Sequence, residues 1–293
     1  MILLTEMLTP SPNQISPKQL DVQACYFDID NTLIANDSAD LPSEEFRQLA
    51  KKVGKILPIN VATARSLQRA SYILESINSQ GISILSNGAV IYDGQKQEIV
   101  ADLRIGLTTT SAICDDLRMA GLAHQIQDDG FDYRWEGGLK YNCPTDPLFP
   151  SGTRQEPQPY HPYKPRLIDV KVFSDSERRS IRELINIKYA SNTLNVSVGH
   201  IGKSKDGRKF TELFIMHNQA NKRSALLAAF AMRGFDKMNI VAVGDGPNDK
   251  ELLNVCGIRV AMGNAVSETL KAASFIVPSQ KEDGAVQVLK ALR

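Results

Sequence analysis

The chain has few cysteines and histidines, and none of them is spaced for a metal site. Its 293 residues include four cysteines and four histidines, with no Cys-x-x-Cys pair and no histidine at ligand spacing. This pattern disfavours a structural zinc and is typical of free thiols in a reducing compartment. The histidines are expected to be surface or hydrogen-bonded residues. We therefore expect a cytoplasmic protein.

Long apolar runs and an excess of charge of one sign are also missing. No segment approaches the roughly 20 apolar residues of a membrane-spanning helix, and the opening MILLTEMLTPSP lacks the regions of a signal peptide. The formal net charge is only +1, which gives no general basic field for nucleic acid or for an anionic membrane. A small molecule is the expected partner, whereas the oligomeric state is not defined by the sequence.

Strand and helix signals alternate at both ends of the chain. Short apolar runs at 24–29, 59–62 and 82–86 are typical of strands buried on both faces of a parallel sheet. Segments of helical periodicity separate them, and the segment 222–293 repeats the scheme. This alternation predicts a doubly wound α/β core.

The middle of the chain has a different pattern, which predicts an α+β insertion into that core. Two helices are expected at 108–120 and 176–190, and the expected strands lie at 165–173, 193–198 and 209–216. The predicted core comprises 1–93 and 212–293, and the predicted insertion comprises 94–211.

Half of the 14 prolines fall between Cys143 and Pro165, within the insertion. Proline cannot donate a hydrogen bond to a strand ladder, so this segment is expected to be an ordered loop or lid. A surface loop without a specific role is the alternative.

Two pairs of aspartates follow predicted strands of the core. Asp28 and Asp30 lie in FDIDNTL, and Asp245 and Asp249 lie in GDGPND. Ligands of open α/β sheets bind at the carboxyl ends of the strands, so both pairs are expected to face one crevice. Four like charges would repel each other unless a hard cation lay among them, and carboxylate oxygens suit Mg²⁺. An Asx turn with a helix cap is the structural alternative for Asp28 and Asp30.

With Mg²⁺ present, this spacing favours phosphoryl transfer. One carboxylate, Asp28, is placed to attack phosphorus and form an aspartyl-phosphate, while Asp30 is placed to protonate the leaving oxygen and later to activate water. Thr63 and Arg65, at the end of INVATAR, and Lys222, at a predicted helix start, are candidates for binding the phosphoryl oxygens.

Four segments in order resemble the motifs of the haloacid dehalogenase (HAD) superfamily of Mg²⁺-dependent phosphatases, specifically its Cof-like type IIB branch. They are FDIDNTL, ATAR, NKRSAL and GDGPNDKELL. SNGAVIYD (86–93) and AMGNA (261–265) also resemble that branch. The resemblance covers nearly the whole chain, and it implies a HAD-like core with a cap domain inserted between the second and third motifs.

The resemblance also implies residue roles. It implies Asp28 as nucleophile, Asp30 as acid/base, and Thr63 and Lys222 as phosphate binders. The implied Mg²⁺ ligands and their supporting residues are Asp28, the Asp30 carbonyl and Asp245, with Asn248 and Asp249 supporting the phosphate or metal site.

Three positions depart from the family pattern, each by replacing a glycine. Asn31 follows the second aspartate, and asparagine tolerates a left-handed backbone, so the turn is expected to survive. Ala64 and Arg223 put the detail of the phosphate pocket in question, because alanine has no easy access to positive φ and Arg223 adds charge.

The function that these observations predict is hydrolysis of a small phosphorylated metabolite, such as a sugar phosphate, a nucleotide or a cofactor. Two alternatives stay open. A phosphomutase would return the phosphoryl group to a sugar, and a non-catalytic ligand-binding or regulatory protein would use the same scaffold without turnover.

Overall fold

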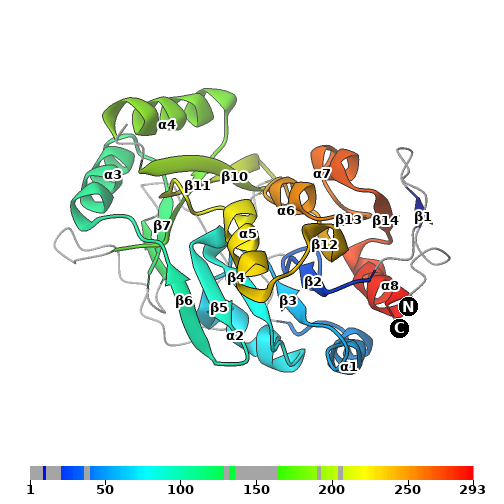
Figure 1. The fold of residues 1–293 in the computed structure, drawn as a ribbon. Coiled ribbons are helices and arrows are strands. Elements are labelled where there is room, and N and C mark those ends of the chain that lie inside the picture. The colour runs from blue at the N-terminus through cyan, green and yellow to red at the C-terminus, as the bar shows by residue number, and fades with distance from the viewer. Residues whose placement is uncertain are drawn as a thin grey trace. The chain divides into compact units, whose positions relative to one another are not determined.

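The chain forms two compact units, each with its own sheets. The computed structural model describes residues 9–10, 21–35, 40–128, 132–135, 164–189, 193–203 and 207–292. One unit comprises Met1–Ala101 with Lys222–Arg293, and the other comprises Asp102–Asn221 (Figure 1). The predicted Pro-rich loop lies outside the described residues except for its last two positions.

The boundaries of the units differ from the predicted ones because of strand pairing. Strand β6 (Glu98–Asp102) pairs with β5 (Val90–Asp93) in a sheet of the first unit, so 94–101 stay with the core. Strand β11 (Lys209–His217) pairs along its length in the sheet of the second unit. The predicted boundary at 211/212 therefore falls inside a strand, and the chain leaves the second unit only at Asn221.

A six-stranded sheet forms the centre of the first unit. Its order is β1-β14-β13-β12-β2-β3, and all neighbours are parallel except β1 and β14. The strands are β1 (Thr9–Pro10), β2 (Ala24–Phe27), β3 (Ile59–Val61), β12 (Ile240–Gly244), β13 (Ile258–Met262) and β14 (Phe275–Val277). Along the chain, β2 and β3 come before β12, β13 and β14, and these three strands lie on the other side of β2 in the sheet. The strand order therefore reverses between β2 and β12, which is where open α/β sheets bind ligands.

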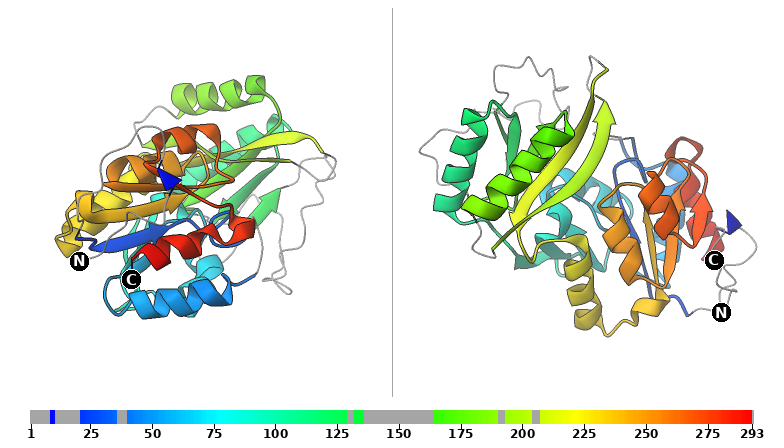
Figure 2. Two further views of the ribbon diagram at one scale, coloured as in Figure 1. Left: turned by 90° about the vertical axis from the view of Figure 1, so that its right-hand side faces the viewer. Right: turned by 90° about the horizontal axis from the view of Figure 1, so that it is seen from above.

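Helices cover both faces of this sheet, as a doubly wound core requires. One face carries α1 (Glu44–Val53), α2 (Leu67–Ser76) and α8 (Gly284–Ala291). The other carries α5 (Lys222–Arg233), α6 (Asp249–Val255) and α7 (Ser267–Ala272). Figure 2 shows α1 and α8 on one side and α6 and α7 on the other. The predicted fold class of the core is confirmed.

Local sequence explains where these helices begin. The hydroxyls of Ser43 and Ser66 accept the backbone N–H of Phe46 and Arg69, which caps α1 and α2. In α1 the apolar side chains recur at helical spacing and are all buried, while two lysines occupy the last turn.

The prediction for 82–86 is only partly correct. Strand β4 (Ile82–Leu85) is buried, but it pairs antiparallel with β5, and the two form a three-stranded sheet with β6. Its link to the parallel sheet is one bridge, between Ala62 and Ile84. The reason is a tight turn at Ser86–Gly88, which returns the chain directly into β5.

The second unit is an antiparallel sheet with helices on one face. The sheet order is β10-β11-β9-β7-β8, and α3 (Leu107–Met119) and α4 (Asp175–Lys188) pack against it in one apolar cluster. The strands are β7 (His124–Gln127), β8 (Asp132–Trp135), β9 (Leu167–Val172), β10 (Leu194–Lys203) and β11. The predicted α+β insertion is confirmed, although sequence patterns did not indicate β7, whose residues HQIQ are mostly polar.

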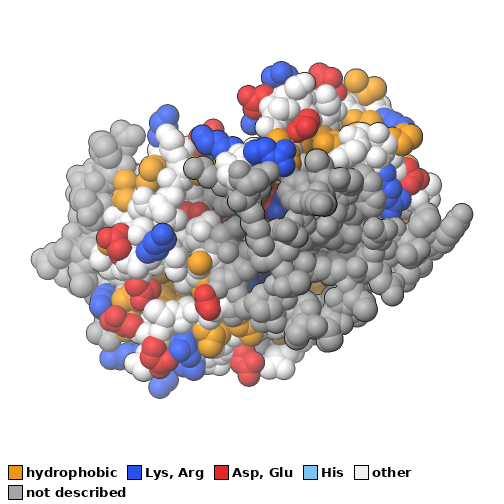
Figure 3. Space-filling view, turned by 180° about the vertical axis from the view of Figure 1, so that it is seen from behind, with side chains coloured by type: hydrophobic (Ala, Val, Ile, Leu, Met, Phe, Trp, Pro, Cys, Tyr) orange, Lys and Arg blue, Asp and Glu red, His pale blue; other side chains and the backbone are white. Residues whose placement is uncertain are grey.

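The surface carries charges of both signs. On the face in Figure 3, the coloured Lys, Arg, Asp and Glu side chains are interspersed, and neither sign forms a continuous patch. This mixture agrees with the small net charge of the chain. None of the helices in the described segments is long and apolar enough to cross a membrane.

Candidate active site

Two aspartates lie at the point where the strand order of the core reverses. Asp28 directly follows β2 and Asp245 directly follows β12, and these strands are neighbours in the sheet. The Asp28 N–H donates to the Val243 carbonyl at 2.9 Å, so regular pairing continues up to the site. Both side chains are almost completely buried. The expectation that the two acidic motifs meet in space is thus met by Asp28 and Asp245.

Asp249 joins them from the first turn of α6. Its Oδ2 accepts the backbone N–H groups of Asp245 at 3.0 Å and Gly246 at 2.9 Å. The carboxylate packs directly on Gly244, where an added Cβ would lie 2.5 Å from the carboxyl carbon. The glycine that ends β12 is therefore required for this close approach.

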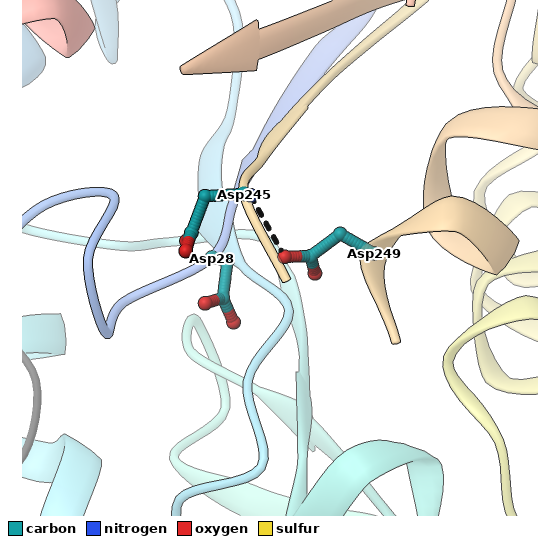
Figure 4. A group of neighbouring side chains, drawn as sticks. All are labelled: Asp28, Asp245 and Asp249. Atoms are coloured by element: carbon teal, nitrogen blue, oxygen red, sulfur yellow. Dashed lines mark hydrogen bonds between the residues drawn. The ribbon is translucent and has the colours of Figure 1, made fainter. Parts of the chain in front are cut away.

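The three aspartates form one cluster of carboxylates (Figure 4). One carboxylate oxygen from each of Asp28, Asp245 and Asp249 can be chosen so that all three atoms lie within 4.8 Å of one another. Asp30, the fourth predicted member, is not among them. Carboxylate oxygens at this spacing are the donor set that a hard divalent cation prefers.

Lys222 is the cation that faces this cluster. It is the first residue of α5 and is buried, and its Nζ donates to Asp28 Oδ1 at 2.8 Å and to Asp249 Oδ1 at 2.6 Å. These partners are 194 and 27 residues away in sequence. The third acid, Asp245, instead accepts a hydrogen bond from the Thr32 hydroxyl at 2.9 Å.

The three carboxylates would carry more negative charge than the single positive charge of Lys222 can neutralise. Burial, together with the charge of Asp249, raises the pKa of Asp28 to about 7, although Lys222 opposes the shift. Burial and the charges of Asp249 and Asp28 raise the pKa of Asp245 to about 9. Burial by itself would lower the pKa of Lys222, but Asp249 and Asp28 outweigh it and raise that pKa. An additional cation would relieve the excess of negative charge.

Asp30 is held apart from the cluster by Arg65. Its two carboxylate oxygens accept from Arg65 Nη2 at 2.6 Å and from Arg65 Nε at 2.9 Å, while Arg65 Nη1 donates to the Tyr72 hydroxyl at 3.0 Å. Asn31 adopts φ 57°, which confirms that asparagine serves as the left-handed residue of this turn. Arg65 was predicted to bind phosphate, but here its guanidinium contacts the predicted acid/base.

The remaining predicted phosphate binders, Thr63 and Asn248, each have a hydrogen-bond partner in the first unit. Thr63 follows β3 and is buried, and its Oγ1 accepts the Arg65 N–H at 3.1 Å. Asn248 precedes α6, and its Nδ2 donates to Asn87 Oδ1 at 3.1 Å.

Two of the departures from the family pattern cause no visible strain. Ala64 does not adopt positive φ, and Arg223 is an exposed residue of α5. The loop of Thr63 and Arg65 and the start of α5 therefore form without the glycines of the family pattern.

Sequence reasoning did not single out several residues that contact the site. Thr32 and Tyr72 contact Asp245 and Arg65, while Asn264 Nδ2 donates to the Asn31 carbonyl at 2.9 Å. Thr32 and Asn264 lie inside recognised motifs, FDIDNTL and AMGNA, so a reading of every polar residue in those motifs would have found them. Tyr72 lies in a helix and carries no such signal.

A buried acidic cluster at the switch point of a doubly wound sheet, with a lysine against it, is suited to bind a divalent cation together with an anionic ligand. The chain belongs to the haloacid dehalogenase-like hydrolases, because the profile of that family matches residues 25–289. This confirms the predicted family and the predicted enzyme class, a phosphatase of the HAD type.

Individual relatives agree with this assignment. The chain is 23% identical over 286 residues to the 5-amino-6-(5-phospho-D-ribitylamino)uracil phosphatase YcsE of Bacillus subtilis, covering 95% of this chain and 98% of that one. It is 22% identical over 284 residues to another 5-amino-6-(5-phospho-D-ribitylamino)uracil phosphatase of the same organism, YwtE, covering 90% of this chain and 96% of that one.

Solved structures share the fold. A haloacid dehalogenase-like hydrolase from Bacteroides thetaiotaomicron superposes with a TM-score of 0.73 at 17% identity, covering 92% of this chain and 99% of that one. The HAD subclass IIB sugar phosphatase BT4131 superposes with a TM-score of 0.68 at 19% identity, covering 92% and 98%. The fold of the chain is therefore shared with these two structures.

Proposed function

We propose that this protein is a Mg²⁺-dependent phosphomonoesterase that uses Asp28 as a covalent nucleophile. The observation that carries the proposal is the buried cluster of Asp28, Asp245 and Asp249 at the strand switch point, with Lys222 bound to two of its members. Burial of several carboxylates lowers the stability of the fold. This loss is explained if the carboxylates hold a cation and one of them reacts.

The residues present fit a magnesium ion. The donors are all oxygens, and the excess negative charge raises the pKa values of Asp28 and Asp245. Asp28 and Asp245 would hold the ion by their side chains, and the Asp30 backbone carbonyl would complete the set that the family resemblance implies. When bound, Mg²⁺ would polarise the phosphoryl group and neutralise charge that develops on it.

Asp249 has a supporting role in this proposal. Its two oxygens already accept three hydrogen bonds, from Lys222 and from the Asp245 and Gly246 N–H groups. It therefore fixes the lysine and the loop that presents Asp245, and it contributes negative charge to the metal site.

The reaction proceeds in two transfers of the phosphoryl group. Lys222 binds Asp28 Oδ1, which leaves Oδ2 to form the bond to phosphorus while the bond to the ester oxygen breaks. Asp30 gives its proton to that ester oxygen. Water then attacks the same phosphorus, Asp30 takes the proton of the water, and Asp28 leaves as a carboxylate with release of phosphate.

Arg65 has a different role from the predicted one in this scheme. Both oxygens of Asp30 accept hydrogen bonds from Arg65. During turnover, one of these bonds must break so that the Asp30 oxygen can contact the ester oxygen. Thr63 and Lys222 then bind the phosphoryl oxygens, Asn248 supports them, and Arg65 orients Asp30.

The proposed substrates are phosphorylated sugars and sugar alcohols, with nucleotides and cofactors as further classes. The names of YcsE, YwtE and BT4131 describe a phosphorylated ribityl group or a sugar phosphate. That the inserted unit acts as a cap and selects among such substrates stays a prediction.

The proposed location is the cytoplasm. Three cysteines of the described chain, Cys25, Cys114 and Cys256, are free thiols, which supports a reducing compartment.

The test is a screen of the purified protein with Mg²⁺ against sugar phosphates, sugar-alcohol phosphates, nucleotides and phosphorylated cofactors. Release of inorganic phosphate by the wild type, and none by Asp28→Asn, is the expected result. No release from any ester would overturn the proposal. A rate that depends on a sugar bisphosphate activator, with transfer back to sugar, would favour the phosphomutase instead.

A further inference from the structure

The turn after β4 has an unusual backbone. Three successive residues have positive φ: Ser86 at 48°, Asn87 at 53° and Gly88 at 100°. Glycine adopts such angles freely, but two adjacent residues with side chains do so only where the surroundings impose it. Backbone strain of this kind is concentrated at functional sites.

The contacts of this turn reach two parts of the proposed site. The Ser86 N–H donates to the Arg65 carbonyl at 2.8 Å and the Asn87 N–H donates to the Thr63 carbonyl at 2.9 Å. The Asn87 side chain is 2% exposed, and its Oδ1 accepts from Asn248 Nδ2 at 3.1 Å. One residue thus joins the loop of Thr63 and Arg65 to the start of α6, which lies 161 residues further along the chain.

Asn248 itself is unusual for its position. It precedes α6, where an asparagine side chain ordinarily accepts a backbone N–H of the first helical turn, yet it makes no such cap. Its amide is bound to Asn87 instead. The Asn248 backbone has helical angles, φ −71° and ψ −18°, instead of the extended angles of a capping residue, so its amide is available to Asn87.

We propose that Asn87 is a positioning residue of the active site, which orients the Asn248 amide and keeps it at a fixed position relative to Thr63. The inference rests on the proposed function, in which Asn248 supports the bound phosphoryl group. Asn87 acts through Asn248 and through the backbone of Thr63. Asn87 belongs to the sequence SNGA (86–89), to which the proposed mechanism assigns no other role.

Asparagine suits this position for two reasons. It tolerates φ near 53° better than other residues with side chains, and its amide oxygen accepts the bond from Asn248. Glycine at position 87 would keep the backbone and remove only the amide. Asn87→Gly is therefore the informative substitution, because it relieves strain and removes the contact.

The chain offers a matched control in Asn78. It has φ 54°, it is exposed, and its side chain accepts only a hydrogen bond from Gln80 in the structure. Asn78→Gly makes the same chemical change at the same backbone angle outside the site. We expect it to leave hydrolysis unchanged.

The experiment is a double-mutant cycle on kcat/KM for p-nitrophenyl phosphate with Mg²⁺. We expect Asn87→Gly to lower kcat/KM by about tenfold in the wild type, and by less than about twofold when Asn248 is already alanine. Asn87→Asp keeps the acceptor and is expected to retain more of the Asn248-dependent rate than Asn87→Gly does. Equal losses from Asn87→Gly in both backgrounds, or no loss in a folded variant, would overturn the inference.

A crystal structure of Asn87→Gly separates this inference from the proposed function. We expect the Asn248 side chain to leave its present orientation or to occupy more than one. An unchanged Asn248 would overturn the positioning role even if the wild type hydrolysed nothing. Absence of hydrolysis by the wild type would, by contrast, overturn the proposed function alone.

Discussion

Two sets of acids, one in each unit, are paired in different ways. In the first unit, Asp28, Asp245 and Asp249 form one buried cluster, and Lys222 binds two of them, Asp28 and Asp249. In the second unit, the exposed Asp102 and the buried Asp116 each have partners of their own. Asp102 accepts from Arg104 and Arg166, and Asp116 accepts from Lys188 and Tyr189.

The pKa values follow this difference. Burial and like charges raise the pKa of Asp28 to about 7 and that of Asp245 to about 9. Burial would also raise the pKa of Asp102, but hydrogen bonds from Arg166 and Arg104 outweigh it and the pKa is lowered. The pKa of Asp116 is likewise lowered, since Lys188 and Tyr189 outweigh burial. Acids paired in this way stabilise a fold, whereas crowded acids indicate a site that binds a cation.

The largest expected effect comes from changing the crowded acid that reacts. Asp28→Asn should keep the fold and lower kcat by about 10⁴-fold, because an amide is a far poorer nucleophile and metal ligand. Steady-state hydrolysis and a thermal melt on the same preparation would test this. A variant that kept a tenth of the wild-type kcat would exclude Asp28 as the covalent nucleophile.

Removal of the cation should come next in size. A chelator should lower hydrolysis by about 10³-fold, and Mg²⁺ should restore it, whereas Ca²⁺ should restore it poorly because it prefers more ligands at longer distances. The measurement is a titration of each metal into chelated enzyme. Full activity in excess chelator would remove the metal from the mechanism.

His124 is a buried residue of the second unit, and its ring Nδ1 hydrogen-bonds the Leu122 carbonyl at 3.0 Å. Burial, with a smaller contribution from the charge of Arg118, lowers its pKa to about 4, although a hydrogen bond with the Leu122 carbonyl opposes the shift. Between pH 6.5 and 4 the unfolded state binds the proton and the folded state does not, so stability falls as the pH falls. The loss should reach about 3 kcal/mol below pH 4.

Trp135 reports on this loss, because the only tryptophan of the chain lies in β8 of the second unit. Urea unfolding followed by its fluorescence at several pH values is the measurement. His124→Asn keeps a donor for the Leu122 carbonyl and should remove this part of the pH dependence. An identical dependence in wild type and variant would contradict the assignment.

The smallest expected effects give the most direct comparison of the units. Replacing an aspartate by asparagine should change the free energy of unfolding with opposite sign in the two units. Without metal, Asp245→Asn should raise stability by about 1 kcal/mol at pH 7, because folding no longer requires proton uptake by a crowded acid whose pKa is raised to about 9, and the amide oxygen still accepts from Thr32. Asp102→Asn should lower it by about 0.5–1 kcal/mol, because the buried Arg166 loses a charged partner that solvent already screens in part.

Urea midpoints in chelator at pH 7, measured by circular dichroism and by Trp135 fluorescence, would decide the comparison. Addition of Mg²⁺ should stabilise the wild type more than Asp245→Asn, and it should stabilise Asp102→Asn as much as the wild type. Shifts of the same sign in both variants would mean that crowding and pairing of acids do not distinguish the units.

Much of the core could be predicted from the sequence because its signals are local. Apolar runs and helical periodicity specified the strands around Asp28 and Asp245 and the helices between them. Asn31 could be expected to form the turn at φ 57°, because that preference belongs to the residue itself. Strand β7 was not predicted, because its residues are mostly polar and give no apolar pattern. The antiparallel pairing of β4 with β5 was not predicted either, because it depends on the strained turn at Ser86–Gly88.

What the sequence by itself determined is which residues stand at the ends of the strands and which chemical groups they carry. Only the tertiary structure decided how those groups are paired. Lys222 lies between Asp28 and Asp249, Arg65 binds Asp30, and Asn87 binds Asn248, over separations of 27 to 194 residues. The physical reason is that a side chain's partner depends on burial and on distances set by packing of the whole unit. The spacing of residues along the chain does not contain that information.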